Sequence, residues 1–353
     1  MLELAAELLP RLRAGERVAV VTVTRVSQSA PRGAGASMAV TAAGRVIGSI
    51  SGGCVEEDAV MLGLRALSTD SGQTARFGFS DADAHAAGLA CGGQIDVVAY
   101  SLGSEDVLAC DALEAVLRDE AVAVGLTVAD GPTLGRLVPV SVDSRGDSIL
   151  TLSHAPRPPL VILGAGDYAA ALCRAAAVCG FAVTVCDAWG LLVTKERFPD
   201  AARLVTALPH EYLRVQAESL DPRTAICVLT HDERLDVPAL REALRLPVAF
   251  VGALGARRTV ARRARLLGEL GVSDEELARL HSPLGLDLAA QTPEETAISI
   301  LAEIVAARRG GSGAPLRALE TPIHGTPRTG STAGGAPDDT GGSCSPRLIG
   351  KST

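Results

Sequence analysis

Two of the eight cysteines stand beside a pair of glycines, in segments whose composition predicts loops. One lies in SISGGCVEED (49–58) and the other in LACGGQIDV (89–97). Glycine permits positive φ angles and lets the backbone approach a bound group closely, and a thiolate is a soft metal ligand. The two segments therefore indicate a site where a thiol meets a ligand. Its candidate residues are Ser51, Gly52, Gly53, Cys54, Cys91, Gly92 and Gly93.

The neighbours of Cys54 act on its thiol in opposite directions. A helical pattern begins directly after it, and a helix N-terminus stabilises a thiolate. Glu56, Glu57 and Asp58 begin that helix, and negative charge raises the pKa of a thiol. A buried structural cysteine is the alternative. With only His85 nearby as a further ligand, the residues predict no closed zinc site, and no base makes Cys54 a hydrolytic nucleophile.

A second candidate site follows an apolar strand in the C-terminal half. VILGAGDYA places Gly164 and Gly166 where a strand ends and a helix begins, with Ala169 in the usual place of the third glycine of a dinucleotide fingerprint. Asp187 ends the next strand, where an acid can bind a ribose hydroxyl. The pattern predicts a Rossmann-type turn that binds NAD(P) or another nucleotide. The alternative is that these glycines only permit tight packing.

Other polar residues near predicted strand ends are weaker candidates. His231 and Asp232 follow the strand AICVLT, where ligand crevices form in parallel sheets. His281 is as compatible with a structural hydrogen bond as with ligand contact. Arginines at a helix start can hold a phosphate, although a solvated helix face is the default. These arginines are Arg257, Arg258, Arg262, Arg263 and Arg265.

The elements that position the first site alternate helices with short strands. Hydrophobic periodicity predicts helices over 2–13, from Val55 onward and over 106–119. The helix from Val55 presents Glu56, Glu57 and Asp58 on its exposed face. Strands are expected over 17–26, 36–41, 44–50, 74–79, 94–100, 121–130, 135–142 and 148–153.

The C-terminal half instead alternates strands with helices, which predicts a doubly wound parallel sheet. Helices are expected through 169–180, from Val237 and from Ala256, and a last one from Pro293 to Arg309. Ser273 with Glu276 and Thr292 with Glu295 fit capping boxes. The expected organisation is a first domain over 1–105, a helix and short strands completing or bridging it over 106–153, a linker over 154–159, a Rossmann-like domain over 160–310 and a disordered tail over 311–353.

Composition limits the classes of function. A formal net charge of -8 argues against a nucleic-acid binder. No stretch reaches the roughly 20 apolar residues of a bilayer span, and the N-terminus lacks a basic leader with a cleavage site. We therefore expect a cytoplasmic protein that binds neither nucleic acid nor membranes. The remaining cysteines are expected to be reduced and mostly in the core.

Six segments taken in order carry a resemblance to a known family. They are SISGGCVEED, LACGGQIDV, LVILGAGDYA, THDERLD, FVGALGARRT and HSPLGLDLAAQTPEETAISILAEIVAARRG. Over residues 2–310 the chain resembles the XdhC/CoxI family of molybdenum-hydroxylase accessory proteins. The resemblance implies an N-terminal α/β XdhC/CoxI domain and a C-terminal Rossmann-like XdhC domain.

The resemblance also implies a function. It is that of a chaperone, rather than a turnover enzyme, which binds molybdenum cofactor (molybdopterin) and protects it while its sulfido ligand is installed. The implied partners are a cysteine desulfurase, which supplies the sulfur, and a xanthine-dehydrogenase-type molybdenum hydroxylase apoenzyme. Separately from the resemblance, we expect the chain to form a homo-oligomer. By the same resemblance, Cys54 and Cys91 are thiols near the molybdenum or the sulfur, and Cys54 is the candidate metal ligand.

Two departures from the family pattern weaken the expected nucleotide site. Asp167 stands where relatives often have histidine after the glycine turn, and ALGARR replaces the more usual LIGSRR. An anionic Asp167 opposes a phosphate at that helix N-terminus. An NAD(P)-dependent oxidoreductase and an adaptor between hydroxylase and desulfurase remain the alternative functions.

Overall fold

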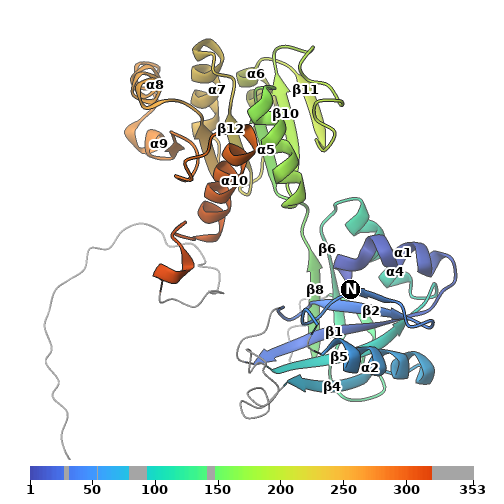
Figure 1. Cartoon of the computed structure of the whole chain (residues 1–353). Helices are drawn as coiled ribbons and strands as arrows, with labels where there is room; N and C mark the ends of the chain where they lie inside the picture. Colours follow the sequence, from blue (N-terminus) through green and yellow to red (C-terminus); the bar gives the residue numbers. More distant parts are fainter. Residues whose placement is uncertain (28–31, 54, 79–93, 141–147, 320–353) are drawn as a thin grey trace, which may run out of the picture. The chain divides into compact units, whose positions relative to one another are not determined.

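The computed structural model describes residues 1–27, 32–53, 55–78, 94–140 and 148–319, and the chain divides into two compact units, Met1–Arg157 and Pro158–Thr353 (Figure 1). Four predicted site residues, Cys54, Cys91, Gly92 and Gly93, lie outside the described residues. The predicted disordered tail lies outside them from residue 320 onward, and before that point Leu316–Ala318 form a 3-10 turn.

The N-terminal unit is built on a five-stranded antiparallel sheet in the order β3-β2-β1-β5-β4. A three-stranded antiparallel sheet in the order β7-β6-β8 accompanies it. Its strands are β1 Val18–Ser27, β2 Ser37–Thr41, β3 Val46–Gly48, β4 Gln73–Gly78, β5 Gln94–Leu102, β6 Val122–Thr127, β7 Leu137–Pro139 and β8 Ile149–His154. Its helices are the 3-10 turn η1 Leu2–Leu4, α1 Ala5–Arg13, α2 Glu56–Thr69 and α4 Val107–Leu117.

Strand β1 is apolar throughout its first half because both faces of the large sheet are covered. Val18 and Val20 pack in a cluster with α1, α4 and the small sheet, whereas Val21 and Val23 pack with α2. A strand buried on both faces reads as a continuous hydrophobic run rather than as an alternating one. Segment 106–153 thus contributes to a core that the first helix also builds.

The C-terminal unit contains a six-stranded parallel sheet in the order β11-β10-β9-β12-β13-β14, which is the doubly wound arrangement predicted from the sequence. Its strands are β9 Pro159–Leu163, β10 Ala182–Asp187, β11 Arg203–Thr206, β12 Ala225–Val228, β13 Phe250–Ala253 and β14 Leu280–His281. Its helices are α5 Asp167–Val178, α6 Pro209–Gln216, α7 Glu233–Arg245, α8 Arg257–Glu269, α9 Asp274–Ala278 and α10 Pro293–Arg309.

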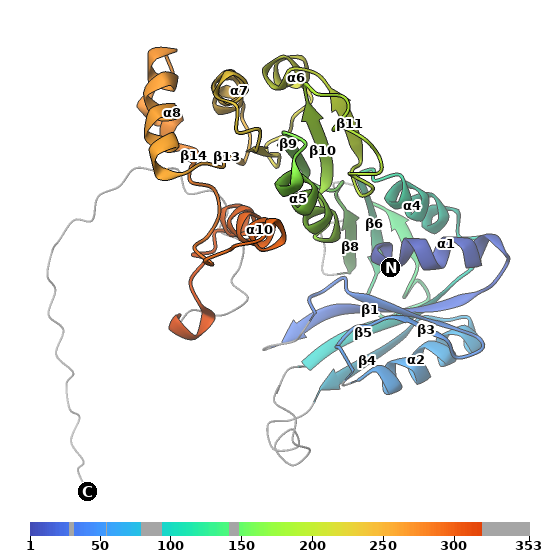
Figure 2. The same ribbon diagram turned by 45° about the horizontal axis from the view of Figure 1, so that its top comes forward.

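Helices cover both faces of this parallel sheet. Figure 2 shows α5 and α10 on one side and α6 and α7 on the other. Alternate residues of β9 serve the two sides, since Leu160 and Ile162 pack with α5 and α10, while Val161 and Leu163 pack with α6 and α7. Among the described residues, no helix combines the length and the apolar character needed to cross a membrane.

Local cap chemistry explains which helix boundaries were predicted correctly. Both capping boxes are present, at Ser273 with Glu276 and at Thr292 with Glu295, and the last helix has the predicted bounds. The prediction that α7 begins at Val237 is wrong. Asp232 caps that helix by accepting a hydrogen bond from the Arg234 amide, so it begins one turn earlier.

A buried ion pair joins α7 to α8 beneath the carboxyl edge of the parallel sheet. Arg263 Nη2 lies 2.8 Å from Asp236 Oδ2, and both side chains are 4% exposed. Arg263 also donates to the Leu254 carbonyl oxygen at 3.0 Å and to Ser282 Oγ at 3.3 Å. Thr230 donates its hydroxyl to the other oxygen of Asp236. The pair is therefore hydrogen-bonded on both sides, as buried charges require.

Replacing Arg263 by Met should destabilise the C-terminal unit strongly, because Asp236 would keep a buried charge without a cation. We expect a loss of about 3–5 kcal/mol in the free energy of unfolding, measured by urea denaturation followed by circular dichroism. Arg265→Met is the matched control, since Arg265 pairs with Glu269 on the exposed face of the same helix. It should cost less than about 1 kcal/mol. Equal effects of the two changes would contradict the role of the buried pair.

Candidate functional site

The loop before α2 is organised by the carboxylate of Glu56. Oε1 of Glu56 accepts hydrogen bonds from Ser49 Oγ at 2.6 Å and from the amides of Ser51 at 2.9 Å and Gly52 at 3.1 Å. Oε2 accepts from Ser51 Oγ at 2.6 Å and from the Gly53 amide at 2.8 Å. Gly52 and Gly53 have φ angles of 86° and 123°, which turn successive amides toward the same point. The loop is therefore an anion-binding nest that the chain fills with its own carboxylate.

These hydrogen bonds determine the charge of Glu56. Burial raises its pKa, but the hydroxyls of Ser49 and Ser51 and the amides of Ser51 and Gly53 outweigh burial and bring the pKa down to about 2. Glu56 is thus ionised throughout the physiological range. The prediction that Glu56 lies on the exposed face of its helix is wrong, because the side chain folds back over the loop. Glu57 and Asp58 are exposed as predicted.

The opposite side of the loop is open. A Cβ atom added to Gly52 or Gly53 would meet nothing within 4 Å, and both residues are exposed. Arg32 holds the beginning of the loop by donating to the Ser49 carbonyl oxygen at 2.7 Å. Arg32 also pairs with Glu3. The described part of the loop is therefore held in place by Glu56 and Arg32, and it is accessible to solvent at Gly52 and Gly53.

The described residues that flank segment 79–93 lie at one end of the five-stranded sheet. Gly78 and Gln94, which flank segment 79–93, pair with each other, and Gln94 also pairs with Ser27 at the end of β1. Both β1 and β3 are antiparallel to β2, so β3 runs toward the same end of the sheet as β1, and the register places its last residue, Gly48, level with Val21. The strands that lead into loop 49–53 and segment 79–93 thus run toward the same end of the sheet.

In the C-terminal unit, Gly164 is required by packing. Its φ angle is 115°, and an added Cβ would lie 2.9 Å from the carbonyl carbon of Leu229 and from the amide nitrogen of Thr230. Gly166 caps α5 and has open space where a Cβ would stand. The carboxyl ends of β9 and β12 therefore approach each other closely, which only glycine permits at position 164.

Asp187, the predicted ribose contact, is buried and bonded to the backbone. Its Oδ2 accepts from the Ala165 amide at 2.8 Å and its Oδ1 from the Trp189 amide at 2.9 Å. It is 6% exposed. The carboxylate thus ties the glycine turn to the end of β10. Asp167, in the first turn of α5, is held by Arg197 at 3.3 Å.

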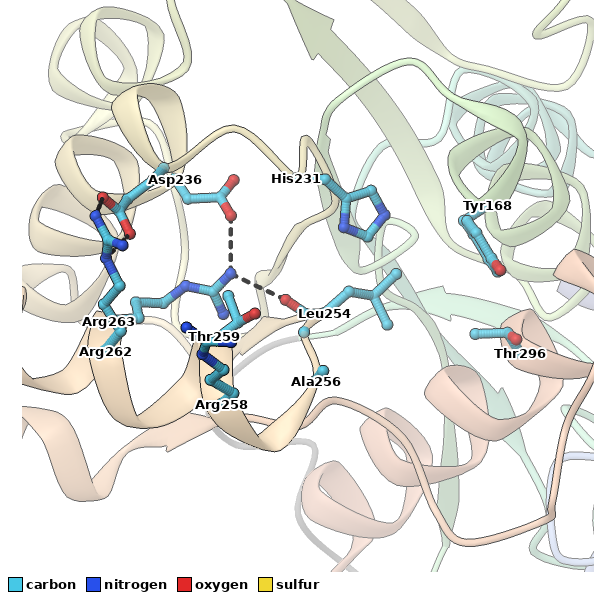
Figure 3. Close-up of a pocket in the computed structure, with 12 residues that line it drawn as sticks. Tyr168, His231, Asp236, Leu254, Ala256, Arg258, Thr259, Arg262, Arg263 and Thr296 are labelled. Carbon is cyan, nitrogen blue, oxygen red and sulfur yellow. Dashed lines mark hydrogen bonds and ion pairs between the residues drawn. The ribbon is translucent and has the colours of Figure 1, made fainter.

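A cleft of about 720 Å³ opens at the carboxyl edge of the parallel sheet, beside the place where strand order reverses between β9 and β12 (Figure 3). His231 follows β12 there with a φ angle of 59°, and its ring meets that of Tyr168 edge-on at 6.2 Å between centroids. The rest of the lining comes from α7, from the β13–α8 turn, from α8 and from Thr296. The lining residues are Tyr168, His231, Glu233, Asp236, Leu254, Gly255, Ala256, Arg258, Thr259, Arg262, Arg263 and Thr296.

The structure thus brings together residues that lie far apart in the sequence. Of the predicted polar candidates, His231, Arg258, Arg262 and Arg263 line this one cleft, whereas Asp232 caps α7. Tyr168 and Asp236 were missed, although Tyr168 adjoins the glycine turn in sequence. His281 has a structural role, since its Nδ1 lies 2.8 Å from Glu303 Oε1 and its ring stacks on Phe250. The described residues contain no group of His, Cys, Asp and Glu placed to hold a metal ion.

Replacing Glu56 by Gln should loosen the loop before α2, because the amide group would point two hydrogens at atoms that are themselves donors. We expect a loss of about 1–3 kcal/mol in the free energy of unfolding, with faster amide hydrogen exchange over 49–55. Glu57→Gln, at the exposed neighbour on the same helix, is the control and should change neither. Unchanged exchange in the Glu56 variant would contradict the role given to its carboxylate.

The contribution of Glu56 should also depend on pH in a defined direction. A carboxylate whose pKa falls from 4.5 in the unfolded chain to about 2 in the folded one stabilises fully above pH 4.5 and loses its effect as the pH falls toward 2. The stability difference between wild type and Glu56→Gln, measured by denaturant titration, should therefore be constant from pH 6 to 8 and shrink below pH 4.5. A difference that grows on acidification would be incompatible with this assignment.

Comparison with family models matches residues 11–78 to the XdhC and CoxI family and residues 160–304 to the XdhC Rossmann domain. A probable xanthine dehydrogenase subunit of Bacillus subtilis (strain 168) is 31% identical over 322 residues, which cover 83% of this chain and 94% of that protein. The molybdenum cofactor insertion chaperone PaoD of Escherichia coli (strain K12) is 29% identical over 302 residues, covering 84% and 85%.

A partial match and a solved structure complete the comparison. The uncharacterized protein YqeB of Escherichia coli (strain K12) is 37% identical over 166 residues, which are 47% of this chain but only 30% of YqeB. The crystal structure of a xanthine dehydrogenase from Bacillus halodurans has a TM-score of 0.72 and 24% identity, covering 87% of this chain and 96% of that one. This last likeness concerns the fold. The predicted family and the α/β fold are confirmed, and the chain belongs to the XdhC and CoxI family.

Proposed function

We propose that this protein is a maturation factor for a molybdenum hydroxylase, and that it binds molybdenum cofactor and delivers it to the apoenzyme. Two relatives that match most of the chain support the proposal, one named a probable xanthine dehydrogenase subunit and the other a molybdenum cofactor insertion chaperone. In this role the protein holds the cofactor while a cysteine desulfurase supplies the sulfur for its sulfido ligand.

The observation that carries the proposal is the loop before α2. Its amides are already satisfied by Glu56, so the loop keeps its shape without a ligand. Its exposed side consists of Gly52 and Gly53, which offer a surface without side chains to a flat ring. In this proposal the pterin ring therefore lies against the exposed glycine backbone. The loop amides do not bind its phosphate, because Glu56 already accepts their hydrogen bonds. A thiolate at the next residue, Cys54, supplies a soft ligand suited to molybdenum.

Cys91 takes the second thiol role in this proposal. Strand β4, which precedes its segment, and strand β3, which precedes the loop before α2, run toward the same end of the sheet. Val55, which directly follows Cys54, packs in the same apolar cluster as Ile95, four residues after Cys91. We assign Cys54 to the cofactor and Cys91 to the handling of the cofactor or its sulfur. Both assignments rest on the bordering residues and on the family pattern.

The test is cofactor loading. Protein co-expressed with cofactor synthesis and purified without oxygen should carry molybdenum and pterin in comparable amounts, measured by elemental analysis and by fluorescence of the oxidised pterin. Cys54→Ala should lose most of both, and Cys91→Ala a part, because each removes a thiol from the proposed site. Cys179→Ala, at an exposed cysteine of the C-terminal unit, is the control and should load like wild type.

Two outcomes would contradict the proposal at different levels. Equal loading of Cys54→Ala and wild type would refute the role of that thiol. A wild-type protein that captures the hydroxylase and the desulfurase in pull-down experiments, yet carries neither molybdenum nor pterin, would instead identify an adaptor.

A further inference from the structure

The cleft of the C-terminal unit has one arginine that no described carboxylate neutralises. Arg263 Nη2 lies 2.8 Å from Asp236 Oδ2, and Arg262 Nε lies 2.8 Å from Glu233 Oε2. Arg258 also lines the cleft but forms no ion pair with a described residue. The lining therefore has three arginines and two carboxylates, although the whole chain carries a formal charge of -8. A locally positive cleft on an acidic chain favours an anionic ligand.

Two of the helices that begin at this sheet edge, α5 and α8, differ in what their N-termini can bind. The first turn of α5 contains Asp167, whose carboxylate occupies the positive end of the helix together with Arg197. The first turn of α8 contains no acidic residue, and no side chain caps it. This turn offers its free amides and, from its second residue, the Arg258 side chain that lines the cleft. Both are donors suited to phosphate oxygens, and the helix dipole adds to the attraction.

The side of the cleft away from α8 offers different chemistry. Figure 3 shows Tyr168 on the side of the cleft opposite Arg262 and Arg263, with His231 and Leu254 between them. Tyr168 and His231 present ring faces and edges, and Leu254 adds an apolar surface. The volume of about 720 Å³ falls within the roughly 300–1,000 Å³ of small-molecule sites. An arginine-lined end and an aromatic end in one cleft suit a ligand with a phosphate and a flat ring.

We propose that this cleft binds a phosphorylated heterocycle, with the phosphate at the N-terminus of α8 beside Arg258 and the ring against Tyr168 and His231. A nucleotide has this chemistry, and so does the pterin phosphate of molybdenum cofactor. This site lies at α8, whereas the glycine turn predicted a nucleotide site at α5. At α5, Asp187 already accepts hydrogen bonds from the backbone amides of Ala165 and Trp189, and the carboxylate of Asp167 repels anions. The nucleotide form of the proposal does not depend on the proposed maturation role, whereas the pterin form rests on it.

The first arm of the test uses nucleoside diphosphates. Isothermal titration calorimetry of the full chain with ADP, GDP, CDP and UDP should reveal binding of at least one of them. Arg258→Ala should weaken that binding about tenfold or more, because one charge-assisted hydrogen bond to phosphate is lost. Arg265→Ala, on the exposed face of the same helix, should bind like wild type. Tyr168→Leu should weaken binding of the diphosphate but leave binding of inorganic pyrophosphate unchanged.

The second arm identifies the source of the phosphate. The pterin content of Arg258→Ala is compared with that of Arg265→Ala after co-expression with cofactor synthesis. Weaker diphosphate binding in Arg258→Ala identifies a nucleotide, and lower pterin content identifies the cofactor's own phosphate. If Arg258→Ala changes neither, the proposal is overturned. Absence of pterin from the wild type would overturn the maturation role and leave the calorimetric result to decide this proposal.

Discussion

Seven hydrogen bonds from described residues converge on the carboxylate of Glu56, and the loop that precedes Cys54 has its shape because of them. Two successive glycines with positive φ turn their amides inward, which would leave several donors unsatisfied if nothing accepted from them. A carboxylate from the next helix supplies the acceptor at a short sequence distance. The loop is therefore formed before any ligand arrives, and a ligand that binds its open side does not have to order it.

Carboxylates perform the same task at the carboxyl edge of the parallel sheet. Asp187 accepts the amides of Ala165 and Trp189, and Asp236 accepts the hydroxyl of Thr230 while pairing with Arg263. Each joins a strand end to a neighbouring element. This use of acids has a consequence for binding, since the groups that a motif would assign to a ligand are already engaged. Among the described arginines that line the cleft, Arg258 of α8 is the one without an ion pair, and the first turn of α8 contains no acidic residue.

The parts predicted from sequence are those that short-range patterns determine. The doubly wound sheet follows from alternating strands and helices, and both capping boxes follow from residue types three positions apart. The role of Glu56 was not predictable from periodicity, because helical spacing places Glu56 with Glu57 on the solvent side of the helix. Its side chain instead turns toward the loop, where the amides of Ser51 and Gly53 donate hydrogen bonds to it. Convergence of His231 and Arg258 on one cleft likewise needs the strand order, which periodicity does not provide. Helix α6 has only eight residues and was missed.

Three described cysteines of the C-terminal unit have thiols that burial keeps protonated at neutral pH. Cys173, Cys186 and Cys227 lie in the core of the C-terminal unit. Burial raises the pKa of Cys173 to about 11 and that of Cys186 to about 12, and it raises the pKa of Cys227 further. Because the thiolate rather than the thiol coordinates metals, these core cysteines, which stay protonated at neutral pH, are poor metal ligands. Cys54 and Cys91, which lie outside the described residues, differ from these three in sequence, because a pair of glycines borders each of them.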